Sequence, residues 1–295
     1  MSKPKKALGQ NFLKSEKIAQ EIAEAGEVGF DDIVLEVGPG KGILTEKLLE
    51  KAKKVIAVEK DEELVYFLSQ KFSEEIKNEK LELISGDILQ SQISNLKSKK
   101  FKYKLIANIP YYITSHLLRT FLESDYQPSL MVLMVQKEVA ERIVGAKRKA
   151  KRNFSRLPAG EAGFTLPRSG AGSDASQNFV LPSSKESLLS ISVKAYGRPE
   201  IIRYAPAGYF SPAPKIDSAV IKISGISKKF FQDIGEQKFF ETVKKGFSQK
   251  RKMLINNLKV KKDDFTACNI DEKARAENLS LEQWKCLTVN VKVSP

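Results

Sequence analysis

The chain has 295 residues, of which 41% are hydrophobic and 29% are charged, as in a soluble globular protein with one large core and room for a smaller second domain. No apolar run approaches the roughly 20 residues of a membrane span, and no apolar signal segment follows the basic N-terminus, so we expect a cytoplasmic protein without a membrane partner. Fifty Lys and Arg against 36 Asp and Glu give a net charge of +14, which favours nucleic acid as a partner, although a generally basic surface would give the same balance.

The cysteine and histidine content limits the chemistry further. Cys268 and Cys286 are too few for a disulfide framework, and with the single His116 they cannot form a metal site. We therefore expect free thiols in a reducing compartment and no metal. His116 is expected to be a solvated helix residue.

The first half of the chain alternates apolar runs with helical patterns. A helix is expected at Ser15–Ala25, with Ser15 as its N-cap. The expected strands are Ile33–Val37, Val55–Val58, Leu81–Ile84, Lys104–Ala107 and Leu130–Val135. The expected helices between them are Gly42–Lys51, Glu62–Phe72, Ser115–Leu122 and Lys137–Val144. This alternation predicts an α/β fold with a doubly wound, mostly parallel sheet, whose ligands bind outside the carboxyl ends of the strands.

After Val144 the composition changes. Residues 145–184 are rich in Gly, Ser, Ala and Pro and open with a basic cluster, so we interpret them as a flexible insertion. This insertion could be a basic arm that folds onto RNA or a tolerated surface loop, and the loop is favoured. The apolar runs Ile201–Tyr204 and Ala219–Ile223 predict an antiparallel hairpin that closes the sheet. Residues 1–225 then form the first domain, and residues 226–295 form a smaller, all-helical domain.

The loop after the first strand suits a cofactor. Ile33–Val37 runs into Gly38-Pro39-Gly40-Lys41-Gly42, and glycines there let the backbone turn tightly beside a ligand. The spacing is not the Gly-x-Gly-x-x-Gly of dinucleotide-binding folds. Because S-adenosylmethionine (SAM) has no diphosphate, a shorter loop against its amino acid part is a sensible alternative to a purely structural turn.

Two carboxylates at strand ends strengthen this hypothesis. Glu59 ends the second strand and can accept both hydroxyls of a ribose, and Asp87 follows the third strand and can accept from an adenine amine. Either acid alone could be a solvated strand end. An NAD-dependent dehydrogenase would share the ribose acid, but it offers no account of the motif after the fourth strand.

That motif is Asn108-Ile109-Pro110-Tyr111, and its residue types suit an exocyclic adenine amine. The lone pair of such an amine is delocalised into the ring, so the nitrogen is a poor nucleophile. The Asn108 side-chain oxygen and the Ile109 carbonyl could bind both amine hydrogens and favour a more tetrahedral nitrogen. Pro110 restricts the backbone around Ile109, and the ring of Tyr111 could stack on an extruded base. The alternative is a strand that merely ends at a proline.

With these motifs assembled, the sequence resembles the ribosomal RNA adenine N6-dimethyltransferases nearly from end to end. Gly9–Leu13 resembles the N-terminal cofactor segment of that family, and Glu36–Gly40 resembles its glycine loop. Phe210–Val220 resembles its late motif, in which Phe210 would be a second aromatic wall opposite Tyr111. The resemblance implies a Rossmann-like methyltransferase sheet, SAM as cofactor, and cofactor contacts from Asn11, Leu13, Gly38, Gly40, Glu59, Asp87 and Asn108.

The C-terminal part points to one branch of the family. The family contains enzymes for small-subunit RNA and resistance enzymes for large-subunit RNA, and Phe247–Leu254, Asn256–Leu258 and Arg275–Trp284 resemble the first. This resemblance implies dimethylation of two adjacent adenines in a hairpin near the 3′ end of small-subunit ribosomal RNA, late in subunit assembly. Its partner would be that RNA or a pre-small-subunit particle, and we expect a monomer.

A basic cluster supports an RNA role for this part of the chain. Lys244, Lys245 and the run Lys250, Arg251, Lys252 are predicted to lie within about two helical turns, where they could follow a phosphate backbone. A solvated basic helix is the alternative. Two rival hypotheses stay open, namely a large-subunit resistance methyltransferase and a non-catalytic RNA-binding assembly or transcription factor on the same fold.

Overall fold

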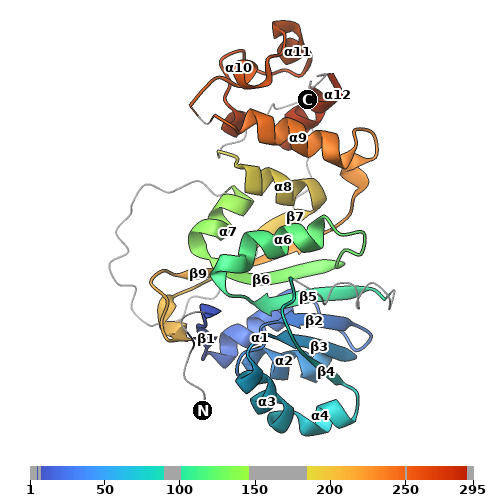
Figure 1. Cartoon of the computed structure of the whole chain (residues 1–295), viewed down its shortest axis with the longest axis vertical. Helices are drawn as coiled ribbons and strands as arrows, with labels where there is room; N and C mark the ends of the chain where they lie inside the picture. Colours follow the sequence, from blue (N-terminus) through green and yellow to red (C-terminus); the bar gives the residue numbers. More distant parts are fainter. Residues whose placement is uncertain (1–4, 6–7, 90–100, 146–184, 250, 291–295) are drawn as a thin grey trace, which may run out of the picture.

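The computed structural model describes residue 5 and residues 8–89, 101–145, 185–249 and 251–290. Its centre is a seven-stranded sheet in the order β4-β3-β2-β5-β6-β9-β7 (Figure 1). The first five strands are parallel, and β9 and β7 are antiparallel to their neighbours. The strands are β2 (Ile33–Val37), β3 (Lys54–Glu59), β4 (Leu81–Ser85), β5 (Tyr103–Asn108), β6 (Leu130–Gln136), β7 (Arg198–Ala205) and β9 (Ser218–Ser224). The predicted doubly wound sheet and its closing hairpin are confirmed.

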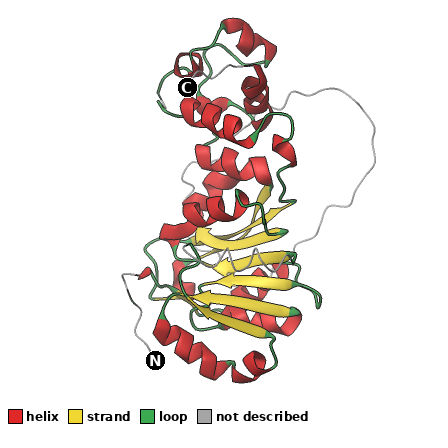
Figure 2. Cartoon of the chain, turned by 45° about the vertical axis from the view of Figure 1, so that its right-hand side comes forward, coloured by secondary structure: helices red, strands yellow, loops and turns green. Residues whose placement is uncertain are grey.

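Both faces of the sheet are covered by helices (Figure 2), because successive strand residues point to opposite sides. Val34 packs in one core with α1 (Glu16–Ala25), α2 (Ile43–Lys51) and α3 (Glu62–Lys71). Its neighbour Leu35 packs in the other core, with α6 (Thr114–Leu122), α7 (Lys137–Val144) and α8 (Leu188–Tyr196). The short helix α4 (Ser73–Lys77) follows α3. Ser15 caps α1 as predicted, accepting from the Ile18 amide at 3.3 Å.

No sequence pattern predicted α8. Its start carries a local signal, since the Ser187 hydroxyl accepts from the Ser190 amide at 3.1 Å and the Ser190 hydroxyl accepts from the Ser187 amide at 2.7 Å. Residues 146–184 of the expected insertion lie outside the described residues. His116 is exposed on α6, as predicted.

The C-terminal helices stand at the far end of the molecule from α3 and α4 (Figure 1). They are α9 (Glu236–Gly246), α10 (Leu254–Leu258), α11 (Lys262–Ala267) and α12 (Leu281–Asn290). Their core continues that of α8, because the Tyr196 ring stacks on Phe240 at 5.8 Å and its hydroxyl donates to Glu236 at 2.6 Å. The predicted helical character of this part is confirmed.

Two expectations for this part were wrong. The basic run is not on one helix, because α9 ends at Gly246 and the exposed Arg251 and Lys252 lie in the turn before α10, while Lys250 lies outside the described residues. Cys268 and Cys286 are not free thiols but form a disulfide, with their Cα atoms 5.6 Å apart. Folding brings them together because Cys268 ends α11 and Cys286 lies within α12.

Among the helices that the structure describes, none is both long and apolar enough to cross a membrane. The described residues also contain no group of three or more His, Cys, Asp and Glu side chains placed to hold a metal ion.

Candidate active site

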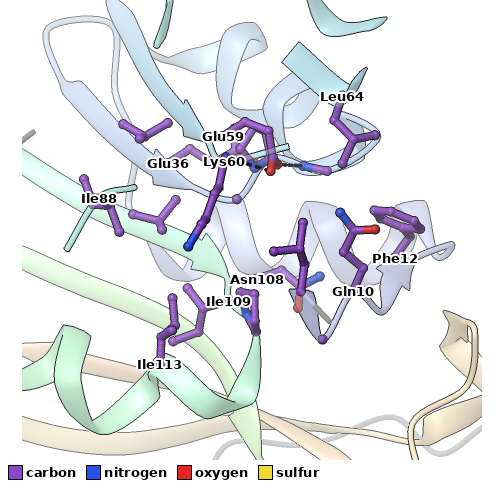
Figure 3. A pocket seen from close by; sticks show the side chains of 18 of the residues that line it. Gln10, Phe12, Glu36, Glu59, Lys60, Leu64, Ile88, Asn108, Ile109 and Ile113 are labelled. Carbon is purple, nitrogen blue, oxygen red and sulfur yellow. Dashed lines mark hydrogen bonds between the residues drawn. The ribbon is translucent and has the colours of Figure 1, made fainter. Parts of the chain in front are cut away.

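A cavity opens at the carboxyl edge of the parallel strands, where the sequence places its motifs (Figure 3). Its walls come from the N-terminal segment, the glycine loop and the ends of β3, β4 and β5. All the expected cofactor residues line it, namely Asn11, Leu13, Gly38, Gly40, Glu59, Asp87 and Asn108. The motif residues Ile109, Pro110 and Tyr111 line it too. Parallel strands end at one edge of a sheet, so residues up to about a hundred positions apart meet there.

The glycine loop is fixed by its backbone conformation. Gly38 has φ +67° and its amide donates to the Val58 carbonyl at 2.9 Å, which joins the loop to β3. A side chain there would meet only Pro110, at 3.9 Å, so the glycine leaves this wall of the cavity open. Gly42 has φ +80°, and a Cβ atom would lie 2.6 Å from the Phe72 ring. The first glycine shapes the cavity and the second lets α2 pack on α3.

The two strand-end acids have different surroundings. Glu59 is buried, and its carboxylate accepts from the amides of Lys60 and Asp61 at 2.9 Å and of Gly40 at 3.2 Å. Burial raises the pKa of Glu59 despite these bonds. Burial also acts to raise the pKa of Asp87, but the Leu89 amide at 3.0 Å and the Lys60 ammonium at 2.9 Å outweigh it and lower the pKa. Asp87 is therefore the more strongly ionised of the two.

Glu36 is a third acid in the cavity wall, and the sequence analysis gave it no role. It lies on β2 with 1% of its surface exposed, and its Oε2 has no hydrogen-bond partner among the described residues. Burial raises the pKa of Glu36 to about 8; Thr45 opposes this shift and the charge of Glu59 adds to it. An ionised carboxyl group buried without a hydrogen-bond partner is costly, so Glu36 holds its proton at neutral pH. The sequence signal that could have identified Glu36 is an acidic residue inside an otherwise apolar strand.

The motif after β5 is held rigidly. Tyr111 begins a 3₁₀ turn, Tyr111–Ile113, and its hydroxyl is 2.6 Å from the Ser218 Oγ on β9. Burial raises the pKa of Tyr111, so its hydroxyl stays protonated at neutral pH. Ile109 is buried, whereas Asn108 is half-buried at the cavity. Figure 3 shows Asn108 and Ile109 side by side below Lys60.

The structure does not bring Phe210 to the cavity. Phe210 is 2% exposed and packs in the core of the α1 face, because β8 (Phe210–Ser211) pairs with β1 (Phe12–Leu13) and sets Leu13 opposite it. It is not among the residues that line the cavity. Its role as a second aromatic wall opposite Tyr111 stays a prediction.

Several residues near the cavity were not singled out by sequence. Gln10, Lys60 and Tyr112 line it, and Tyr112 is 63% exposed. Asp61 lies just behind it and binds Gln10. The hydrogen bond between Gln10 and Asp61 joins positions 51 residues apart, and no local pattern in the sequence predicts such a contact.

Comparisons with known proteins agree on one family. The model of the family described as ribosomal RNA adenine dimethylase matches residues 1–157 and 178–291. The unmatched stretch falls within residues 145–184. A ribosomal RNA small subunit methyltransferase A of Dehalococcoides mccartyi is 36% identical over 96% of this chain and 87% of its own length. A protein of the same name from Clostridium acetobutylicum is 32% identical over 95% and 90%.

Two solved structures resemble the whole chain. The 23S rRNA methyltransferase ErmE matches with a TM-score of 0.70 at 21% identity, over 95% of this chain and 98% of its own. A dimethyladenosine transferase from Plasmodium falciparum matches with a TM-score of 0.68 at 25% identity, over 95% and 96%. The likeness to ErmE concerns the fold alone, so the fold does not by itself choose between the two ribosomal subunits.

Proposed function

This chain belongs to the ribosomal RNA adenine dimethylase family, and from that premise we propose that it uses SAM to dimethylate N6 of two adjacent adenines in small-subunit ribosomal RNA. The observation that carries the proposal is the meeting of Gly38, Glu59, Asp87 and Asn108 in one cavity. The names of the relatives from D. mccartyi and C. acetobutylicum favour the small subunit.

The cavity fits SAM. Asn11, Leu13, Gly38 and Gly40 border the space for its amino acid part. Glu59 is assigned to the ribose hydroxyls and Asp87 to the adenine amine, each at the end of its own strand. When bound, SAM supplies an electrophilic methyl group on a sulfonium sulfur.

The chemistry of the chain itself is orientation. The Asn108 side-chain oxygen and the Ile109 carbonyl accept the two hydrogens of the target amine, which aims the nitrogen lone pair into the cavity. Tyr111, fixed by Ser218, offers its ring to the extruded base. No strong base is required, since the methylated nitrogen can lose its proton to solvent, so catalysis rests on positioning and electrostatics.

The helical part, residues 226–295, is assigned to RNA binding, with Lys250, Arg251 and Lys252 contacting phosphates. The turn that carries Arg251 and Lys252 leaves both side chains exposed, as such a role needs. Residues 1–225 form the methyltransferase domain. We place the protein in the cytoplasm as a monomer, acting on a pre-small-subunit particle.

A methyl-transfer assay tests the proposal against its rivals. The protein is incubated with methyl-labelled SAM and either undermethylated small subunits or naked large-subunit RNA, and the labelled base is mapped. Label only in N6-methylated adenines of the small subunit is expected. Label only in large-subunit RNA would replace the proposal with the resistance activity. Tight RNA binding without any label would favour a non-catalytic factor.

A further inference from the structure

One buried carboxylate joins the N-terminal segment, here residues 8–13, to the sheet beside the cavity. Asp61 lies between β3 and α3, and 1% of its side chain is exposed. Its Oδ1 accepts from the Lys5 ammonium at 2.7 Å and from the Glu63 amide at 3.2 Å. Its Oδ2 accepts from the Gln10 side-chain amide at 2.8 Å. Asp61 therefore caps α3 and binds two residues of the N-terminus at once.

The partners of Asp61 are also bound to each other. The Lys5 amide donates to the Gln10 Oε1 at 2.7 Å, and the Leu8 amide donates to the Lys5 carbonyl at 3.0 Å. Lys5 forms a second ion pair, with Glu63, at 3.0 Å. Lys5 and Gln10 are thus bound to each other as well as to Asp61.

The N-terminal segment is a wall of the cavity that is held at both ends. Every residue from Leu8 to Leu13 lines the cavity, whereas Lys5 and Asp61 do not. The far end is held by the pairing of Phe12 and Leu13 with β8 and by the Lys14 amide, which donates to the Tyr209 carbonyl at 2.8 Å. The near end is held by Asp61. Figure 3 shows Gln10 and Phe12 across the cavity from Ile88.

The contacts of Asp61 with Lys5 and Gln10 help to hold the N-terminal segment, and they can also break. Burial acts to raise the pKa of Asp61, but Lys5, Gln10 and the Glu63 amide outweigh it and lower the pKa, so the carboxylate is ionised. Hydrogen bonds to a charged group are stronger than those between neutral groups. If Lys5 and Gln10 move away, the carboxylate is exposed to water and keeps the Glu63 amide, so opening leaves no buried, unpaired charge.

We propose that Asp61 is a latch that fastens the N-terminal segment over the cavity, so that a bound cofactor escapes only after the contacts of Asp61 with Lys5 and Gln10 break. Asp61 is a positioning residue, because it touches neither the cavity nor a reacting atom. Its amide also donates to the Glu59 Oε1 at 2.9 Å, so the turn that orients the ribose acid is the turn that holds the latch. The inference rests on the proposed function only for the identity of the cofactor.

Lys5→Met tests the latch without touching the cavity or the cap of α3. The dissociation rate of S-adenosylhomocysteine, measured by stopped flow, is expected to rise about tenfold, which corresponds to about 1.4 kcal/mol. The kcat at saturating SAM should stay unchanged while the KM for SAM rises. Asp61→Asn keeps a capping side chain and should give a similar rise, and the double variant should add little to either.

The matched control is Lys54→Met, which removes an ion pair of the same length, 2.7 Å to Glu82, at the opposite edge of the sheet. It should leave the dissociation rate unchanged. Hydrogen exchange of residues 8–13 in the ligand-free protein is the second readout, and it should accelerate in Lys5→Met but not in Lys54→Met. A Lys5→Met protein with wild-type exchange in residues 8–13 would overturn the latch.

The proposed function and the Asp61 latch can be disproved independently of each other. If the wild type binds S-adenosylhomocysteine but methylates no small-subunit RNA, the proposed function fails and the dissociation rates still decide the latch. If it binds no such ligand, the hydrogen exchange alone decides the latch.

Discussion

At the scale of single residues, the proposed function gives different tasks to side chains that share one cavity. Asn108 is assigned to the target amine, and Glu59 and Asp87 to the cofactor, although all three line the same cavity. The buried Glu36 also lines the cavity but has no assigned task, and burial raises its pKa.

The assignment of Asn108 predicts that binding and catalysis can be separated. Asn108→Ala should lower the rate of methyl transfer at least about a hundredfold, as expected for the loss of an orienting polar group. Its affinity for SAM, measured by calorimetry, should change little, because Glu59, Asp87 and the glycine loop remain. Equal loss of binding and transfer would mean that Asn108 serves the cofactor alone.

The surroundings of Glu36 predict a pH-dependent stability. The pKa of Glu36 is about 8 in the folded chain against an ordinary value of 4.5, so the folded state holds a proton that the unfolded state releases between these values. Its contribution is fully present below pH 4.5 and is lost as the pH rises to about 8. Between about pH 5.5 and about pH 8, the free energy of unfolding should fall by about 3 kcal/mol more in the wild type than in Glu36→Gln. Urea unfolding of both proteins measures this, and parallel pH profiles would contradict it.

At the scale of elements, the sequence predicted what local patterns encode. The strands β2 to β6 alternate with helices, and apolar runs and capping residues such as Ser15 indicated each of these elements except α4. Because parallel strands end together, the same patterns predicted that the acids after β3 and β4 would meet the glycine loop. The part of the cavity wall at the strand ends could be predicted for this reason, whereas Asn11 and Leu13 were expected there only from the resemblance to a family.

What could not be predicted depends on contacts between distant residues. The Cys268–Cys286 disulfide requires the packing of α11 on α12, and the hydrogen bond from Gln10 to Asp61 spans 51 positions. Phe210 enters the core because β8 pairs with β1, two short strands that no periodicity indicates. The basic run was assigned to one helix because its composition suits a helix, but the chain turns after Gly246.

The packing of α2 on α3 predicts a large difference between two glycines. Gly42 and Gly225 both have positive φ, so an alanine strains the backbone at either site. Only at Gly42 would the new Cβ overlap a ring, 2.6 Å from Phe72, whereas at Gly225 it meets the flexible Arg198 side chain at 3.8 Å. Gly42→Ala should lower the free energy of unfolding by about 1 to 3 kcal/mol more than Gly225→Ala. Equal losses in chemical denaturation would mean that α2 moves away from Phe72.

At the scale of the whole molecule, the proposed function assigns the recognition of RNA to two places, the carboxyl edge of the sheet and the C-terminal helices. The first offers a cavity for one base and a cofactor, and the second carries exposed cations that can follow a phosphate backbone. The net charge of +14 favours association with RNA in general, so the position of the cations decides which contacts are specific.

This division predicts a change in the salt dependence of RNA binding. The double variant Arg251→Ala, Lys252→Ala should reduce the slope of log affinity against log salt by about 1.4 to 1.8, because each phosphate contact contributes roughly 0.7 to 0.9. Lys53→Ala, Lys77→Ala removes the same charge from exposed sites near α2 and α4 and should change the slope little. Equal slopes for the two variants would show that only net charge matters.

Mass spectrometry of RNase fragments of small-subunit RNA, after incubation with the protein and SAM, tests the proposed dimethylation most directly. If one cavity orients the amine of each adenine for successive transfers, the digest should contain two N6,N6-dimethyladenosines per particle at adjacent positions. Asn108→Ala should leave both adenines unmodified. Methyl groups on another base, or on the ribose, would contradict the assignment of Asn108 and Ile109 to the amine of adenine.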